Sequence, residues 1–161
     1  MKKLLLLSLV LMLGACGFHL RGPAQLPFET IYVQGGGNQL GPDLQRYLRH
    51  GTNVNVVQTP GEAQAVLVIL GEGREKRILS LTGGGRVGEF ELYYRLSFRL
   101  HDVKGTELMP AQQLELKRIL AFSDVQVLAK EQEEALLYRD MQNDAVQQVV
   151  RATRSRGFAE R

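Results

Sequence analysis

The 161-residue chain contains no tryptophan, one cysteine and five prolines, and only 7% of its residues are aromatic. A single cysteine excludes an intramolecular disulfide. The formal net charge is +3, but without Lys2 and Lys3 there are 18 Lys and Arg against 17 Asp and Glu, which leaves +1. No basic cluster is interleaved with aromatic side chains that could stack on bases, so the sequence does not indicate nucleic-acid binding.

The sequence also lacks the motifs of common catalytic and cofactor sites. The glycine runs at 35–37 and 83–85 are not followed by Gly-Lys-Ser/Thr and show no dinucleotide-binding spacing, so we predict simple turns there. No Gly-x-Ser-x-Gly elbow is present. The histidines, none with a second His or Cys at metal-ligand spacing, are His19, His50 and His101. The sequence therefore predicts no catalytic residue, no metal site and no cofactor.

Residues 1–15 have the organisation of an export signal. Lys2 and Lys3 form a positive start, residues 4–13 are almost all apolar, and Gly14 and Ala15 are the small residues that a signal peptidase requires. The apolar segment is too short to span a bilayer, which takes about 20 residues. No later segment is long and apolar enough. We therefore expect an exported chain from which residues 1–15 are removed.

The only cysteine follows this signal directly. Leu13-Gly14-Ala15-Cys16 resembles the bacterial lipoprotein box, in which the cysteine thiol takes a diacylglycerol and the freed amine is acylated after cleavage. Several acyl chains, at about 0.8 kcal/mol per buried CH₂, form a stable anchor. Gly17 at the next position, in place of aspartate, favours the outer membrane by the same resemblance. The alternative is a buried core cysteine behind an ordinary signal.

The rest of the chain predicts one α+β domain, residues 29–161, joined to the lipid by a tether at 16–28. We expect strands at 29–34, 53–58, 65–72 (with a possible continuation through 76–81), 90–100 and 107–122. Apolar spacing predicts helices from residue 40 to a C-cap at Gly51 and over about 130–155. The strand at 90–100 alternates strictly, which indicates one buried and one wet face. Together these elements predict a two-layer sandwich, with a mostly antiparallel or mixed sheet of about four to five strands packed on two helices.

Two stretches carry a resemblance to a known family. "CGFHLRG" (16–22) follows the lipoprotein box, and "VLAKEQEEAL" (127–136) leads into the last predicted helix. With the order of elements, these stretches resemble the LptE family. The resemblance implies a non-enzymatic lipoprotein of the Gram-negative outer membrane that plugs the β-barrel LptD one-to-one and helps to place lipopolysaccharide in the outer leaflet.

The resemblance also implies contact with lipopolysaccharide, whose lipid A phosphates suit Lys and Arg side chains. Lys130, at the predicted start of the last helix, and Arg86, at the predicted hairpin tip, are the main candidates. Lys117 and Arg118 are weaker ones. Each could instead be a solvated surface charge. Two other functions stay open at this point: an accessory subunit of a different envelope complex, and a lipid-anchored hydrolase.

Overall fold

The computed structural model describes residues 25–156, which form five strands and two α-helices. The strands are β1 (Thr30–Gln34), β2 (Asn55–Val56), β3 (Ala65–Leu81), β4 (Val87–Asp102) and β5 (Glu107–Ala121). The helices are α2 (Leu40–Gly51) and α3 (Val127–Arg156), and short 3₁₀ turns cover Pro60–Glu62 and Asp124–Gln126. The predicted α+β class is confirmed.

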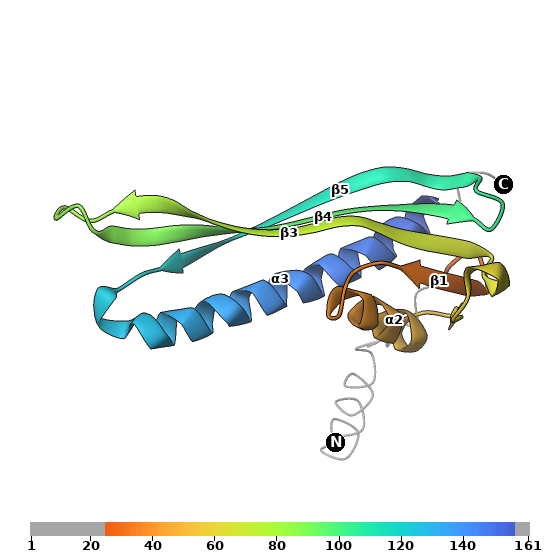
Figure 1. Cartoon of the computed structure of the whole chain (residues 1–161), viewed down its shortest axis with the longest axis horizontal. Helices are drawn as coiled ribbons and strands as arrows, with labels where there is room; N and C mark the ends of the chain where they lie inside the picture. The colour runs from red at the N-terminus through yellow and green to blue at the C-terminus, as the bar shows by residue number, and fades with distance from the viewer. Residues whose placement is uncertain (1–24, 157–161) are drawn as a thin grey trace, which may run out of the picture.

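The five strands form one mixed sheet in the order β2-β1-β3-β4-β5. β1 pairs in parallel with both β2 and β3, while β3, β4 and β5 form an antiparallel meander. Figure 1 shows α2 and α3 on the same face of the sheet, where the two helices also contact each other. The molecule therefore has two layers, with a helix face and an open face of the sheet.

The long elements make the molecule elongated. β3 has 17 residues, or about 55 Å of strand, and α3 has 30 residues, or about 45 Å of helix. In Figure 1 the β3–β4 hairpin and the start of α3 extend well beyond β1 and α2. We call this the distal end: the β3–β4 turn at residues 82–86, the adjoining strand ends and residues 125–130. None of the helices within residues 25–156 has the length and apolar content needed to cross a membrane.

The core lies between the helix face of the sheet and the two helices. Alternate residues of β4 point to this face, and each is at most 3% exposed: Leu92, Tyr94, Leu96, Phe98 and Leu100. Fully buried residues recur every four positions on both helices, namely Leu40, Leu44 and Leu48 on α2 and Met141, Ala145 and Val149 on α3. The two apolar helix stripes predicted from periodicity therefore cover the apolar face predicted from alternation.

Several predicted boundaries are shifted. The strand predicted at 53–58 shrinks to Asn55–Val56, and α3 begins at Val127 rather than near residue 130. Gly51 is the last residue of α2 and not its C-cap. Thr52 follows it in an extended conformation, and its hydroxyl donates to the carbonyl of Leu48 at 2.6 Å and accepts from the amide of Val54 at 3.3 Å. The Thr52 hydroxyl thus caps the end of α2, which is the role that the sequence predicted for Gly51.

The edge strand and its turn agree with the sequence. Gly105 has φ +86° in the β4–β5 turn, a conformation that favours glycine. Pro110 lies on β5, which is an edge strand, so its missing N–H breaks no ladder hydrogen bond on the outer side. The pairing of β4 with β5 shifts register near Leu100, beside the proline.

Candidate functional site

Arg86 lies in the tight turn at the tip of the β3–β4 hairpin. The amide of Thr82 donates to the carbonyl of Arg86 at 2.7 Å, and the amide of Gly85 donates to the carbonyl of Thr82 at 2.9 Å. Gly85 supplies the positive φ of +74° that closes the turn. Arg86 is exposed at this tip. The structure therefore places Arg86 at the distal end, at the hairpin tip as predicted.

Lys130 lies at the same end of the molecule, in the first turn of α3. Its Nζ is 2.8 Å from a carboxylate oxygen of Glu133, and only 18% of its side chain is exposed. The first turn of α3 contains no acidic residue. A cation there faces the positive end of the helix dipole, which disfavours it by a few tenths of a kcal/mol up to about 1 kcal/mol. The ion pair with Glu133, three residues further along the same helix, offsets part of this cost by about 0.2–0.5 kcal/mol.

Lys117 and Arg118 do not join Arg86 and Lys130 in one site. Because neighbours on a strand point to opposite faces, Lys117 lies on the open face and Arg118 on the helix face. Lys117 Nζ is 3.3 Å from Glu115, whereas Arg118 Nη2 is 2.6 Å from Asp144 of α3. Arg118 thus connects β5 to α3. Of the four candidates only Arg86 and Lys130 share an end of the molecule, and contact of any of the four with lipopolysaccharide stays a prediction.

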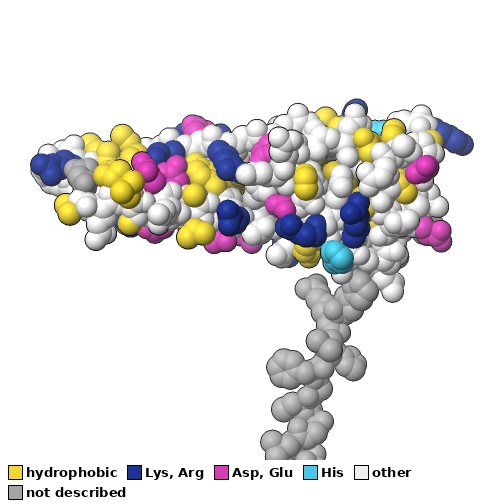
Figure 2. All heavy atoms as spheres, turned by 60° about the horizontal axis from the view of Figure 1, so that its bottom comes forward, with side chains coloured by type: hydrophobic (Ala, Val, Ile, Leu, Met, Phe, Trp, Pro, Cys, Tyr) yellow, Lys and Arg dark blue, Asp and Glu magenta, His cyan; other side chains and the backbone are white. Residues whose placement is uncertain are grey.

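Hydrophobic side chains accompany Arg86 and Lys130 at the distal end. Figure 2 shows hydrophobic side chains gathered at that end of the molecule. Those with exposed fractions from 42% to 92% are Ile78, Leu79, Leu81, Ile119, Val125, Val127 and Leu128. We call these seven residues the distal apolar patch; they lie on the start of α3 and on both faces of the sheet, because Ile78 pairs with Phe90 on the helix face and Ile119 with Glu91 on the open face. Exposed apolar groups beside cations suit a ligand that is both apolar and anionic.

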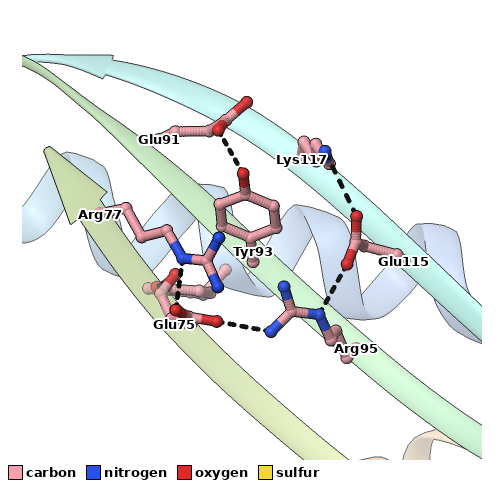
Figure 3. Close-up of polar contacts among 8 residues, drawn as sticks. Glu75, Arg77, Glu91, Tyr93, Arg95, Glu115 and Lys117 are labelled. Carbon is pink, nitrogen blue, oxygen red and sulfur yellow. Dashed lines mark hydrogen bonds and ion pairs between the residues drawn. The ribbon is translucent and has the colours of Figure 1, made fainter. Parts of the chain in front are cut away.

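The open face carries a polar cluster centred on Tyr93. Figure 3 shows the ring among three cations, and the Arg77, Arg95 and Lys117 charges lie 4.8 to 4.9 Å from its centroid. The Tyr93 hydroxyl donates to Glu91. Tyr93 is only 6% exposed, although it points away from the core. The prediction of a uniformly wet face is therefore wrong at this residue, because the long cationic side chains cover the ring.

Ion pairs tie the Tyr93 cluster across three strands. Arg95 of β4 bonds Glu75 of β3 at 2.5 Å and Glu115 of β5 at 2.6 Å. Hydrogen bonds from Arg77 and Arg95 lower the pKa of Glu75, and a hydrogen bond from Arg95 lowers the pKa of Glu115. With Glu91 and Lys117 included, three carboxylates balance three cations. The cluster is electrically neutral and does not by itself attract an ion.

Two of the residues singled out in the sequence, Cys16 and His19, lie outside the described residues. The glycine runs at 35–37 and 83–85 lie in turns, as predicted. Within residues 25–156 no group of three His, Cys, Asp or Glu side chains could hold a metal ion.

Sequence reasoning missed the Tyr93 cluster. The alternation along β4 puts Tyr93 on the open face, but only the register Glu75–Tyr93–Lys117 shows what surrounds it. A strand of alternating charged residues flanking a tyrosine was the available signal. The partners on β3 and β5 could not be assigned without the pairing.

The fold and surface thus define an elongated two-layer α+β domain with one open sheet face. Solved structures share this fold. A lipoprotein B from Nitrosomonas europaea is 47% identical with a TM-score of 0.76, covering 86% of this chain and 91% of that one. The rare lipoprotein B from Shewanella oneidensis is 25% identical with a TM-score of 0.69, covering 79% of this chain and 95% of that one.

Sequence comparisons identify the family. The family described as "LptE: Lipopolysaccharide-assembly" matches residues 28–153. An LPS-assembly lipoprotein LptE from Yersinia enterocolitica is 30% identical over 155 residues, which cover 92% of this chain and 73% of that protein. One from Yersinia pestis is 30% identical over 153 residues, which cover 91% of this chain and 72% of that protein. The chain belongs to the LptE family of lipopolysaccharide-assembly lipoproteins, as its sequence motifs predicted.

Proposed function

We propose that this chain is an outer-membrane lipoprotein, anchored through acyl groups on Cys16, that plugs the LptD barrel and helps to insert lipopolysaccharide into the outer leaflet. Membership of the family supports the role in lipopolysaccharide assembly. The proposal assigns no catalytic step, metal or cofactor to the chain. Its own work is to occupy the barrel and to contact the transported lipid.

The shape and polarity of the domain support the plug. A molecule about 55 Å long is comparable to the roughly 40–45 Å thickness of a bilayer with its headgroups. Barrel interiors are polar, so a plug needs surfaces with mixed charge. The neutral Tyr93 cluster provides such a surface on the open face of the sheet. Arg95 and its carboxylate partners are already hydrogen-bonded to one another within the domain, so they need no partner on the barrel wall.

The distal end supports the contact with lipopolysaccharide, and this is the observation that carries the finer proposal. The glycolipid combines phosphates with acyl chains. The distal end combines Arg86 and Lys130 with the distal apolar patch. Each part of the ligand thus has chemically matched side chains at one end of the domain.

Recovery of the complex tests the plug. A C-terminally tagged chain, purified from outer membranes in mild detergent, is expected to retain a large β-barrel protein at one-to-one stoichiometry. Because a plug is enclosed by its partner, the complex should survive 1 M salt, which screens exposed charge pairs beyond about 3 Å. A chain recovered alone, or with a different envelope complex, would support the alternative of an accessory subunit elsewhere and contradict the plug.

Charge removal at the distal end tests the lipid contact. Arg86→Gln and Lys130→Gln are each expected to weaken lipopolysaccharide binding about three- to tenfold, since one partly exposed charged contact contributes about 1 kcal/mol. Photocrosslinking to lipopolysaccharide from the distal end is the readout. Lys130→Gln removes an unfavourable interaction with the helix dipole but also breaks the ion pair with Glu133. The unfolding temperature of the variant is therefore measured alongside, and a loss of crosslinking at an unchanged unfolding temperature supports the lipid contact.

Lys104→Gln is the matched control, because Lys104 is an exposed lysine in the β4–β5 turn. It should leave crosslinking unchanged. Equal losses in all three variants would show a general effect of net charge and would remove the assignment of Arg86 and Lys130.

A further inference from the structure

A second charged surface lies between α2 and α3, beside β3. It is a hollow of about 560 Å³, a size that suits a small ligand. Its polar lining is unusual in carrying three arginines and one carboxylate. The lining residues that matter here are Arg46, Arg74, Arg139, Asp43, Gln39 and Asn143. We call this hollow the arginine cleft. Figure 2 shows Lys and Arg side chains along this face of the molecule.

A chain of hydrogen bonds holds two of these arginines in place. Arg74 Nη2 donates to Gln142 Oε1 at 3.0 Å, and Gln142 Nε2 donates to Asp43 Oδ2 at 2.7 Å. Arg46 Nη2 donates to Asp43 Oδ1 at 2.6 Å. Gln142 is only 4% exposed, and a cation on one side and an anion on the other fix the orientation of its amide. The chain joins β3, α3 and α2, so it positions both guanidinium groups before any ligand arrives.

The guanidinium group of Arg74 packs against two aromatic rings. Its guanidinium carbon lies 5.9 Å from the Tyr94 centroid and 5.5 Å from the Tyr138 centroid. Both rings are fixed by their own hydroxyls: Tyr94 donates to Glu72 at 2.8 Å, and Tyr138 donates to the carbonyl of Glu75 at 2.9 Å. Arg74 is therefore backed by two rigid side chains and presents its remaining edge to the cleft.

Most guanidinium donors in the cleft are unused within the described chain. An arginine has five N–H groups. Among residues 25–156, Arg74 and Arg46 donate only through Nη2, and the guanidinium of Arg139 makes no hydrogen bond or ion pair. The lining carries three positive charges against one negative, and Glu72, outside the lining, lies 3.9 Å from Arg74 Nη2 and reduces the local surplus to one. Unused donors together with surplus positive charge suit an oxyanion held by bidentate contacts.

The cleft continues along the two helices. A neighbouring hollow of about 540 Å³ shares Asp43, Arg46 and Asn143 with it and adds Tyr47 and His50. A ligand longer than a bare ion thus has room beyond the arginines. Amides of Gln39 and Asn143 on the wall suit hydroxyl groups.

We propose that the arginine cleft binds an oxyanion, namely a phosphate group, either free or as the monoester of a small hydroxylated molecule. The proposal goes beyond the proposed function and does not depend on it, because it concerns α2, α3 and the middle of β3 rather than the distal end. It also accounts for Arg139, which has no partner in residues 25–156.

The test is a titration of the isotope-labelled mature chain with inorganic phosphate and, separately, with glucose 6-phosphate at constant ionic strength, followed by backbone amide shifts. Saturable shifts are expected at residues 38–46 and 139–143. Binding of glucose 6-phosphate at least fivefold more tightly than inorganic phosphate would identify a phosphate ester as the ligand class. Equal affinities would identify free phosphate.

Arg139→Gln is expected to weaken binding of both probes at least fivefold. Arg99→Gln removes an exposed arginine of β4 that is not part of the cleft, and it should change binding less than twofold. No saturable shift with either probe, or equal effects of the two substitutions, would overturn the proposal. It would also be overturned if neither probe bound and Arg139→Glu abolished recovery of the barrel, since the cleft would then be a protein contact.

Discussion

Replacement of Gly41 by alanine is expected to lower the free energy of unfolding by about 2–3 kcal/mol, the cost typical of overpacking. The first turn of α2 crosses the β1–α2 loop so closely that a Cβ on Gly41 would lie 2.8 Å from the carbonyl oxygen of Gly35. The Gly41 amide also donates to the carbonyl of Gly36 at 2.9 Å. Because the backbone fixes the position of the Cβ and the atom that it meets is a backbone carbonyl oxygen, no side-chain rotation can relieve the clash.

The midpoint of thermal unfolding should fall by roughly 8–12 °C for that loss, since 1 kcal/mol is about 4 °C in a domain of this size. Gly37→Ala measures the cost of backbone strain without a steric clash, because Gly37 has φ +53° and open space around it. It should cost only about 1 kcal/mol. Gly61→Ala, in open space without a positive φ, should be neutral. If Gly41→Ala were also neutral, the close crossing of loop and helix would be refuted.

The backbone crossing illustrates what sequence could and could not predict. Composition marked 35–37 as a turn, and the three glycines indeed have positive φ. Nothing in the local pattern showed that Gly41 also had to be a glycine, because its constraint comes from a carbonyl six residues earlier. Likewise, the period of β4 predicted which residues face the core. The parallel pairing of β1 with β3 depended on the whole topology.

The candidate sites follow the same division. Arg86 could be placed at a hairpin tip because two strands and a glycine turn bracket it in the sequence. The arginine cleft could not be predicted, because Arg46, Arg74 and Arg139 come from three elements up to 93 positions apart. That Lys117 and Arg118 point to opposite faces follows from strand alternation alone, whereas their partners Glu115 and Asp144 could be assigned only from the structure.

Loss of the acyl anchor is the second large effect that we expect. Cys16→Ala, expressed without residues 1–15, gives a chain that cannot be acylated. In flotation with protein-free phospholipid vesicles, the acylated mature chain should rise with the lipid. The variant should stay in the soluble fraction, because each buried CH₂ of an acyl chain contributes about 0.8 kcal/mol and no comparable apolar helix replaces it in residues 25–156. Because the vesicles contain no barrel protein, binding to a protein partner cannot hold the chain on the lipid in this measurement.

The same variant separates an anchor from a structural role. The described core begins at Leu26 and Phe28, which are 5% and 8% exposed, ten or more positions after Cys16. If the cysteine only carries lipid, the variant should unfold at the same temperature as the acylated chain in matched detergent and should still capture the barrel. Lower affinity for vesicles with unchanged stability therefore supports the anchor. A destabilised variant would instead favour the buried core cysteine, and flotation equal to that of the acylated chain would place the membrane attachment elsewhere, with the distal apolar patch as the first surface to mutate.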